Sequence, residues 1–385
     1  MSGYRTRLWV GGTAAALLFS SAASSVGAVS LTDATRELLK VTNLGPDVLE
    51  GLDKELTIPQ AWIEGARKED AVRIRLTMHE TNFAKVWKVF SARYPDIKME
   101  YTRGIGQQRA VGPLLALKRG SYVADIVTSF ETMEKEFREI DGLLDLLKEL
   151  PAAKSIRPDF NSAHGIGVAW RLQHYCIAYA TDRVKKANLP KTWEELLTDT
   201  RWRNGKVGMA ANFNVWLAQL WGLKGEAWTT SYMDRIFSDL KPQLRKERLA
   251  AIPKLTTVGE FDLAIPGGDA IVMDFKKEGV PVGFHCPDPV PIYMAWVGVV
   301  KGGPRVNSAK VFANWLLSRE GQIAVWHADN VVPASKELMR KEFFAFPEEV
   351  LGKKVAAYSP VVIELMPKIA TAWQQRWVHA GGPEN

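Results

Sequence analysis

Residues 72–128 alternate between strand-like and helix-like patterns, and this limits the folds open to the chain more than any other feature. Residues 72–76 and 97–101 alternate apolar and polar side chains, and residues 124–128 form a third short strand-like run. The helix between the first two strands is marked by apolar residues at helical spacing: Phe83, Val86, Trp87 and Phe90. A second helical stretch precedes the third strand. Such an order predicts an α/β fold with a mostly parallel sheet covered by helices.

A second set of strand-like runs indicates another unit of the same kind. These runs are residues 175–179, 206–210 and 296–300. The chain has 385 residues, which is enough for two core-bearing lobes and too many for one ordinary core. No low-complexity linker separates the units, so we expect the chain to pass between the lobes more than once.

Local signals place several helices outside these strands. Thr192 is followed three residues later by Glu195, a capping box that predicts a helix start. The helix after residue 304 is expected to be capped by Asn307 or Ser308. Residues 29–70 are helix-rich in pattern, and we expect them to form an extension that covers one face of the body.

The first 28 residues have the three-part pattern of a secretory signal peptide. Arg5 and Arg7 supply the positive start, residues 8–19 an apolar stretch, and residues 26–28 a small-residue cleavage site. The apolar stretch is shorter than the roughly 20 residues that span a bilayer, which argues against an uncleaved anchor. Because no cysteine lies near the cleavage site, we expect an exported, soluble mature protein without a lipid anchor.

Charge and cysteine content narrow the classes of partner. The formal net charge of +7 is not concentrated in a dense run of Lys and Arg, so we expect no nucleic-acid partner. Cys176 and Cys286 lack metal-ligand spacing. They are either two buried small apolar residues or one disulfide, which an oxidising compartment would allow.

Catalytic and cofactor-binding motifs do not stand out. The chain has no G-x-S-x-G, no H-E-x-x-H and no P-loop, and its six histidines show no nucleophile–base spacing. We therefore expect no cofactor, no metal and no enzymatic activity. An enzyme that uses His79 as a base and Glu80 to orient it is the alternative.

Four segments in order resemble the iron/thiamine/polyamine-type family of bacterial extracellular solute-binding proteins of ABC transporters. The most specific runs from LPKTWEELL to WRNGKVGM. The four are residues 90–100, 124–127, 189–209 and 299–335. The resemblance covers about residues 71–340, and residues 29–70 have no counterpart in it.

The resemblance implies a two-lobed periplasmic-binding-protein fold, in which each lobe is a mostly parallel sheet flanked by helices and two crossing strands form the hinge. Residues 71–168 and 293–385 would form the first lobe and residues 169–292 the second. The implied protein is a periplasmic monomer that captures a small-molecule ligand by hinge closure and delivers it to an inner-membrane ABC permease. On this layout Cys176 and Cys286 each lie near a crossing strand, where a disulfide is reasonable.

Ligand contacts are expected in loops after the carboxyl ends of strands, where open parallel sheets bind ligands, and in the crossing region. The candidates are His79, Glu80, Thr81, Arg103, Ser129, Phe130, Asn212, Phe213, Gly259, Glu260, Asp288 and Tyr293. Simpler explanations stand beside these roles. His79, Thr81 and Ser129 could cap helices, a helix dipole alone favours Glu80, and Arg103 could be a surface charge.

The nature of the ligand stays open between two classes. The resemblance favours ferric iron, but iron sites of the family use two adjacent tyrosines in the second lobe. The corresponding loop here contains Asn212 and Phe213, and no Tyr-Tyr pair occurs in the chain. We therefore expect a small organic solute, with ferric iron as the first alternative. A periplasmic sensor that presents its ligand to a receptor is the second.

Overall fold

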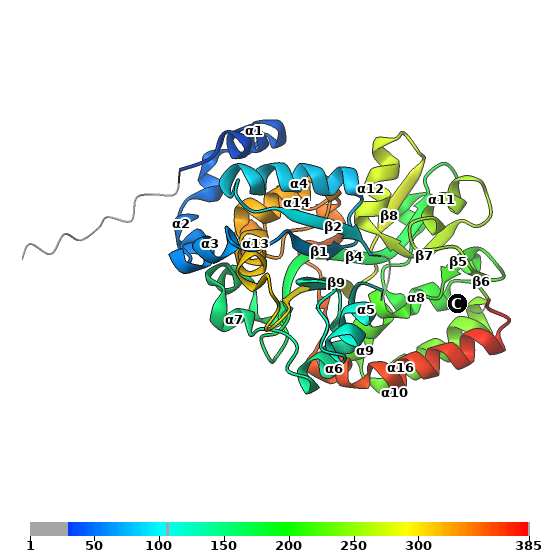
Figure 1. The fold of residues 1–385 in the computed structure, drawn as a ribbon. Helices are drawn as coiled ribbons and strands as arrows, with labels where there is room; N and C mark the ends of the chain where they lie inside the picture. Colours follow the sequence, from blue (N-terminus) through cyan, green and yellow to red (C-terminus); the bar gives the residue numbers. More distant parts are fainter. Residues whose placement is uncertain (1–29, 105–107, 384–385) are drawn as a thin grey trace, which may run out of the picture.

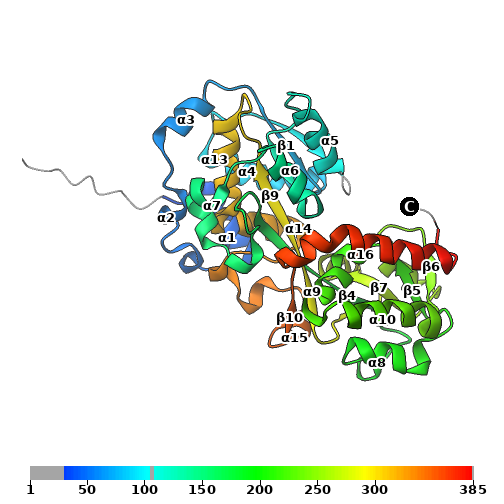
Figure 2. The same cartoon turned by 90° about the horizontal axis from the view of Figure 1, so that it is seen from below.

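The computed structural model describes residues 30–104 and 108–383, and it consists of two α/β lobes joined by two long strands (Figures 1 and 2). The predicted signal peptide, residues 1–28, lies outside the described residues. The strands, in chain order, are β1 (Val72–Leu76), β2 (Met99–Arg103), β3 (Ile126–Thr128), β4 (Val168–Ala180), β5 (Val207–Ala210), β6 (Gln243–Arg245), β7 (Leu263–Gly268), β8 (Val282–His285), β9 (Val290–Val299) and β10 (Val355–Ala356).

Strand pairing divides the sheet into two halves that share β4 and β9. In the first lobe β1 pairs in parallel with β2 and β3, and in the second β5 pairs in parallel with β6 and β7. Residues 168–174 of β4 pair with β9, whereas residues 175–180 pair with β7 and β8. β9 in turn continues to β3. The predicted two-lobed α/β fold with two crossing strands is therefore confirmed.

Helices flank both halves of the sheet (Figure 1). The α-helices are α1 (Asp33–Thr42), α2 (Asp53–Leu56), α3 (Gln60–Ala66), α4 (Glu80–Arg93), α5 (Gln108–Leu117), α6 (Glu134–Glu139), α7 (Leu146–Glu149), α8 (Trp193–Thr198), α9 (Leu217–Lys224), α10 (Glu226–Arg235), α11 (Ile252–Thr257), α12 (Asp269–Lys277), α13 (Val306–Leu317), α14 (Arg319–Asp329), α15 (Pro347–Val350) and α16 (Pro360–His379). Two 3₁₀ turns also matter below, namely η2 (Glu131–Met133) and η3 (Pro151–Ser155).

The N-terminal extension packs against the outer helices of the first lobe. α1 lies against α4 and α14, α2 lies against η3, and α3 runs along α13 (Figure 1). The apolar residues that anchor it are buried: Leu38, Leu39, Val48, Leu49 and Leu52. The extension is thus part of the first lobe's core, because its apolar face has no other partner.

The extension also caps α13, which differs from the sequence prediction. Neither Asn307 nor Ser308 is the N-cap of this helix, since both lie inside it. Their backbone N–H groups instead donate to the Glu69 carboxylate, at 3.1 and 2.8 Å. An acidic side chain from another segment thus satisfies the free N–H groups of the helix start, where the helix dipole favours negative charge.

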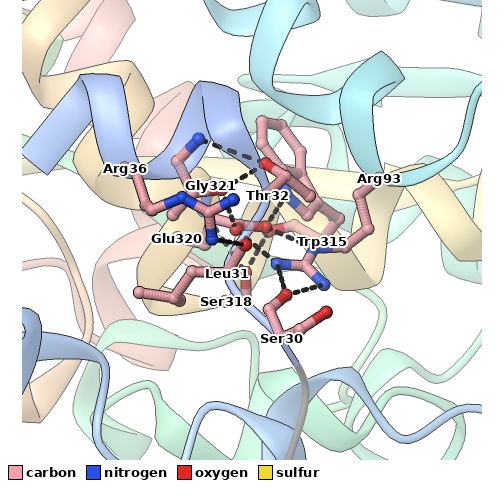
Figure 3. Close-up of polar contacts among 10 residues, drawn as sticks. Ser30, Leu31, Thr32, Arg36, Arg93, Trp315, Ser318, Glu320 and Gly321 are labelled. Carbon is pink, nitrogen blue, oxygen red and sulfur yellow. Dashed lines mark hydrogen bonds and ion pairs between the residues drawn. The ribbon is translucent and has the colours of Figure 1, made fainter.

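Two buried carboxylates tie the extension to the first lobe, and we call Thr35, Glu55, Arg93, Arg319 and Glu320 the outer seam. The Glu320 carboxylate accepts hydrogen bonds from Arg93 Nε and Nη2, at 2.7 and 2.6 Å, and from Thr35 Oγ1, at 2.6 Å. Trp315 Nε1 is a further donor at 2.7 Å, so Glu320 lies between Trp315 and Arg93 (Figure 3). Similarly, Glu55 accepts from the backbone N–H and Nε of Arg319, at 2.7 and 2.6 Å.

The C-terminal segment divides between the lobes. α14 packs against α4 of the first lobe, whereas α16 lies along α9 and α10 of the second and also contacts η2 (Figure 2). We had expected residues 293–385 as a whole to complete the first lobe. The segment before α16 is therefore a third connection between the lobes.

A disulfide joins two strands of the second lobe. Cys176 on β4 and Cys286, directly after β8, are bonded with their Cα atoms 5.0 Å apart. Of the two alternatives for these cysteines, the structure has the bonded one. Within residues 30–104 and 108–383, no helix is long and apolar enough to cross a bilayer.

Candidate functional site

Charged and phenolic side chains gather where the two crossing strands meet, and we call Arg109, Glu131, Arg171, Tyr175 and Tyr293 the central cluster. None of the five is more than 9% exposed. Arg171, Gln173 and Tyr175 alternate along β4 and so project from one face of the strand. Gln173 pairs with Tyr293 on β9, which brings that tyrosine to the same face.

The first lobe contributes a buried carboxylate to this cluster. Glu131, in η2, accepts a hydrogen bond at 2.6 Å from the backbone N–H of Trp296 on β9. Burial raises the pKa of Glu131 to about 7, although this hydrogen bond and the charges of Arg109 and Arg171 act in the opposite direction. Near neutral pH the carboxyl group therefore exists in both its charged and its neutral form.

Arg171 is held in place on two sides. Its Nη1 donates to Asp329, on α14, at 2.9 Å, and its guanidinium lies 4.8 Å from the centroid of the Trp170 ring. The side chain is only 6% exposed. This fixes the guanidinium in the junction between the lobes.

Arg109 reaches the same place from α5. Its aliphatic stem passes directly over Gly104, where a Cβ atom would come within 2.2 Å of the Arg109 Cγ atom. Burial lowers the pKa of Arg109. Tyr293 and Glu131 act against that shift, and the nearby charge of Arg171 adds to it. The two guanidinium groups thus repel each other inside the protein.

Three buried tyrosines surround these charges. The ring centroids of Tyr175 and Tyr293 are 6.1 Å apart, and those of Tyr293 and Tyr358 are 6.2 Å apart. Burial, with the charge of Glu131 adding, raises the pKa of Tyr293 to about 12, and burial also raises the pKa values of Tyr175 and Tyr358. All three are therefore neutral phenols, and the hydroxyls of Tyr175 and Tyr358 donate to Gln173 Oε1 and to the Asn214 carbonyl oxygen.

Of the predicted residues, Ser129 and Tyr293 lie in or next to the central cluster. Ser129 follows β3 with a positive φ of 54° and is buried, and its backbone N–H donates to the carbonyl oxygen of Trp296 at 2.9 Å. Phe130, in contrast, is fully buried against Phe137 and Trp296 and belongs to the core.

The predicted residues around β1 and β2 lie at the solvent-exposed edge of the first sheet. His79 is the N-cap of α4 and hydrogen-bonds Thr81, as its simpler explanation required. Glu80 and Arg103 are exposed. This edge touches the central cluster indirectly, because Asn82 Nδ2 donates at 3.3 Å to Asp329, the partner of Arg171.

In the second lobe the loop predictions are mixed. Asn212 and Phe213 do follow β5, as expected, but Asn212 is exposed and Phe213 packs on Trp373. Gly259 and Glu260 were wrongly placed after a strand. Residues Ile252–Thr257 form α11, so both precede β7 and lie at the amino edge of its sheet.

Asp288 also lies away from the central cluster. It is exposed, and its side chain accepts a hydrogen bond at 3.2 Å from the backbone N–H of Lys354. Its backbone pairs with Thr192 at the start of α8. The contacts given by Asp288 therefore join the C-terminal segment to the second lobe.

Glu131 lies in the predicted loop after β3, but five other residues at the site were missed as ligand candidates: Arg109, Arg171, Tyr175, Asp329 and Tyr358. A signal for two of them was present. Polar side chains recur at every second position in Arg171, Gln173 and Tyr175, within a strand whose other residues are apolar apart from His174 and Tyr179. A buried strand needs a reason for such a pattern, because burying charge is costly without a partner.

Metal-ligand groups and surface cavities do not coincide with the central cluster among the described residues. Among the described residues, no three His, Cys, Asp or Glu side chains are grouped as a metal site would require. Two surface cavities of about 380 and 370 Å³ lie elsewhere, one lined by residues 42–48 with Trp326, Arg340 and Glu342, the other by residues 244–247 with Gly381 and Pro383. Neither contains a member of the central cluster.

Comparison with solved structures shows where this fold recurs. Iron-bound HitA from Pseudomonas aeruginosa matches with a TM-score of 0.66 at 18% identity, over 80% of this chain and 99% of that one. Trichodesmium IdiA (FutA) in complex with iron and citrate matches with 0.66 at 16%, over 80% and 99%. The substrate binding protein of an ABC transporter from Agrobacterium tumefaciens matches with 0.64 at 13%, over 81% and 96%.

Comparison of sequences gives the family. An uncharacterized protein of Haemophilus influenzae is 28% identical over 161 residues, which are 38% of this chain and 43% of that protein. The chain thus spans less than half the length of this curated relative. The sequence pattern of the bacterial extracellular solute-binding proteins matches residues 85–349. Because this match includes more than half of the chain, the protein belongs to the bacterial extracellular solute-binding protein family.

Proposed function

We propose that this protein is the periplasmic substrate-binding component of an ABC importer, and that it captures a small organic solute between its lobes. The observation that carries the proposal is the central cluster. Buried charges stand at the junction of the two lobes, supplied by α5, by η2 and by the half of β4 that pairs with β9. Burying charge is costly without partners, and a polar ligand that binds between the lobes can supply them.

Hinge closure follows from how this cluster is buried. Since its side chains are almost without solvent contact, a solute enters only when the lobes separate. The lobes meet at polar contacts that can open reversibly. Asn330, at the end of α14, donates to Asp274 and accepts from Lys277 of α12, both at 2.6 Å, and Arg138 pairs with Glu364 at 3.4 Å. Such rim contacts are individually weak.

The compartment and the partners belong to the same proposal. Family membership and the signal-like pattern of residues 1–28 support export to the periplasm. The protein would act there as a monomer that binds its solute unchanged, without cofactor, nucleic acid or catalysis. Its closed form would be the form that an inner-membrane permease recognises. A sensor partner would use the same closed form.

Ferric iron is the second candidate ligand, and one observation favours it. Tyr175, Tyr293 and Tyr358 meet although they are far apart in sequence, and phenolate oxygens suit a hard cation. The two buried guanidinium groups oppose this, because they repel a bare trivalent cation.

The proposal is tested by adding solutes to the purified protein. The right solute should raise the melting temperature and reduce the radius measured by small-angle scattering. If no solute in a broad panel changes either quantity, the binding proposal fails. Ferric citrate should leave the protein colourless; a visible charge-transfer band would replace the organic solute with iron.

A further inference from the structure

The N-terminal extension differs in charge from the rest of the protein. Residues 30–70 contain nine acidic and five basic residues, whereas residues 71–385 contain 34 acidic and 43 basic ones. The extension is thus a net negative segment on a net positive body. It also lies outside residues 85–349, which the family pattern matches. Such a charge asymmetry along a chain is typical of a segment that meets a partner of opposite charge.

A surface cavity of about 380 Å³ lies where the extension meets the first lobe. Residues 42–48, at the end of α1 and in the 3₁₀ turn η1 (Pro46–Leu49), form one wall, and Trp326, Arg340 and Glu342 form the other. α1 lies on the outside of the molecule (Figure 1). We propose that this cavity, which we call the extension cavity, is a docking site where a basic segment of a partner protein inserts an arginine or lysine side chain.

The charges that line the extension cavity favour a cation. Asp47 and Glu342 are both exposed and face a single cation, Arg340. Arg340 Nη1 lies 3.5 Å from Asp47, and the two side chains are 44% and 67% exposed. Because so open an ion pair is weak, Asp47 can also accept a cation from a partner. Thr42, the last residue of α1, brings the negative end of the helix dipole to the same wall.

The apolar part of the extension cavity suits a long basic side chain. Trp326 is half-buried, and its ring is held at the edge of Phe343, with the ring centroids 4.9 Å apart. A guanidinium or ammonium group gains energy over the face of an indole ring. The methylene stem of such a side chain packs on apolar residues, which Leu44 and Val48 supply here. Arginine and tryptophan are also the residues on which protein interfaces most often depend.

The same charges argue against a second copy of this chain as the occupant. A symmetric dimer places the same surface of both copies face to face. Two net negative extensions would then repel each other. A segment from a different, basic protein is therefore the partner that this surface fits. The proposal does not depend on the solute that the two lobes capture.

The test measures binding of three probes to the purified protein by calorimetry at low salt. They are a blocked peptide of alternating arginine and glycine, a blocked peptide of alternating glutamate and glycine, and arginine amide. We expect the arginine peptide to bind with a dissociation constant below about 1 mM, and its affinity to fall as salt is added. The glutamate peptide should not bind, and arginine amide should bind more weakly than the arginine peptide.

Matched variants separate the extension cavity from the overall charge of the extension. Asp47→Asn combined with Glu342→Gln should weaken binding of the arginine peptide at least about tenfold, because Arg340 then repels it. Glu50→Gln combined with Glu64→Gln removes the same charge from exposed positions of the extension outside the cavity. This control should change the affinity less than about twofold. The urea unfolding midpoint of each variant verifies folding.

Four results would overturn the proposal. They are no binding of the arginine peptide, equal binding of the glutamate peptide, equal weakening in both double variants, and arginine amide binding as tightly as the peptide. The last would make the cavity a small-molecule site. Sedimentation of the protein as a dimer that Asp47→Asn with Glu342→Gln dissociates would make a second copy the occupant and would also overturn it. None of these results touches capture of a solute between the lobes.

Discussion

The outer seam and the central cluster both bury arginine and glutamate side chains. The two regions differ in how these charges are balanced by their neighbours. In the outer seam the Glu320 carboxylate accepts two hydrogen bonds from Arg93, one from Thr35 and one from Trp315. In the central cluster the charge of Arg171 acts unfavourably on Arg109, and burial raises the pKa of Glu131 to about 7.

The pKa values express this difference. Burial tends to lower the pKa of Arg93, but the hydrogen bonds and charge of Glu320 outweigh it and the pKa rises. Burial lowers the pKa of Arg109, and its neighbours do not reverse the shift. The charge and hydrogen bonds of Glu320 thus outweigh the effect of burial on Arg93, whereas the charges around Arg109 do not outweigh it.

The largest expected effect is on the outer seam. Glu320→Gln leaves Arg93, which is 10% exposed, without its counter-charge, and losing one member of a buried pair costs about 3–5 kcal/mol. Urea unfolding should show this loss, while solute affinity stays as in the wild type. Glu64→Gln, at an exposed position of α3, is the control and should be neutral. If the urea unfolding midpoint of Glu320→Gln equals that of the wild type, the outer seam does not stabilise the first lobe as this comparison requires.

Next in size is the pH dependence that Glu131 gives to stability. Its pKa is about 7 in the folded protein against 4.5 ordinarily, so the folded state holds a proton that the unfolded chain has lost between these values. Stability from this group is complete below about pH 4.5 and falls as the pH rises to about 7, by roughly 3 kcal/mol. Glu131→Gln should abolish that slope in unfolding free energies measured from pH 4.5 to 8. Glu139→Gln, at an exposed position, should keep the pH slope of the unfolding free energy. If the slope also survives in Glu131→Gln, another titrating group causes it.

A smaller effect is expected from one donor of the outer seam. Thr35→Val keeps the side-chain shape and removes the hydroxyl that donates to Glu320, while three other donors remain. The loss should be about 1.5 kcal/mol in urea unfolding. Thr57→Val, at an exposed threonine, should stay within about 0.5 kcal/mol of the wild type. If Thr35→Val and Thr57→Val lose the same unfolding free energy, the hydrogen bond from Thr35 to Glu320 does not contribute to stability.

The smallest effect concerns the rim between the lobes. Asn330 has a positive φ of 53°, which glycine accepts, so Asn330→Gly removes the contacts with Asp274 and Lys277 without backbone strain. The closed state should lose stability relative to the open one, and solute affinity should fall about threefold in calorimetry. The unfolding midpoint should hardly change. Tighter binding in this variant would show that Asn330 opposes closure.

The sequence predicted the strands and local helix caps of the two lobes better than it predicted the residues of the site. The capping box of Thr192 and Glu195 is present, because capping depends on neighbours within one turn. The cap of α13 was wrong, because Glu69 arrives from a segment more than two hundred residues earlier. Caps formed by residues within one helical turn could therefore be predicted from the sequence, whereas contacts between distant segments could not.

The same limit explains the site. The rule that ligands bind after strands led to loops such as the one at Gly259 and Glu260, which follow a helix. Tyr293 was found because it lies on a crossing strand, but Tyr358 and Asp329 reach the junction only through tertiary packing. The alternation of Arg171 and Tyr175 on β4 was the one overlooked signal that the sequence contained.

The central claim is that the solute binds at the central cluster, and a crystal structure of the protein with its co-purified solute tests it most directly. The account predicts density for the solute between the lobes, within hydrogen-bond distance of side chains of the central cluster. Density for the solute in the cavity beside Trp326 and Arg340, or anywhere else outside the central cluster, would contradict it.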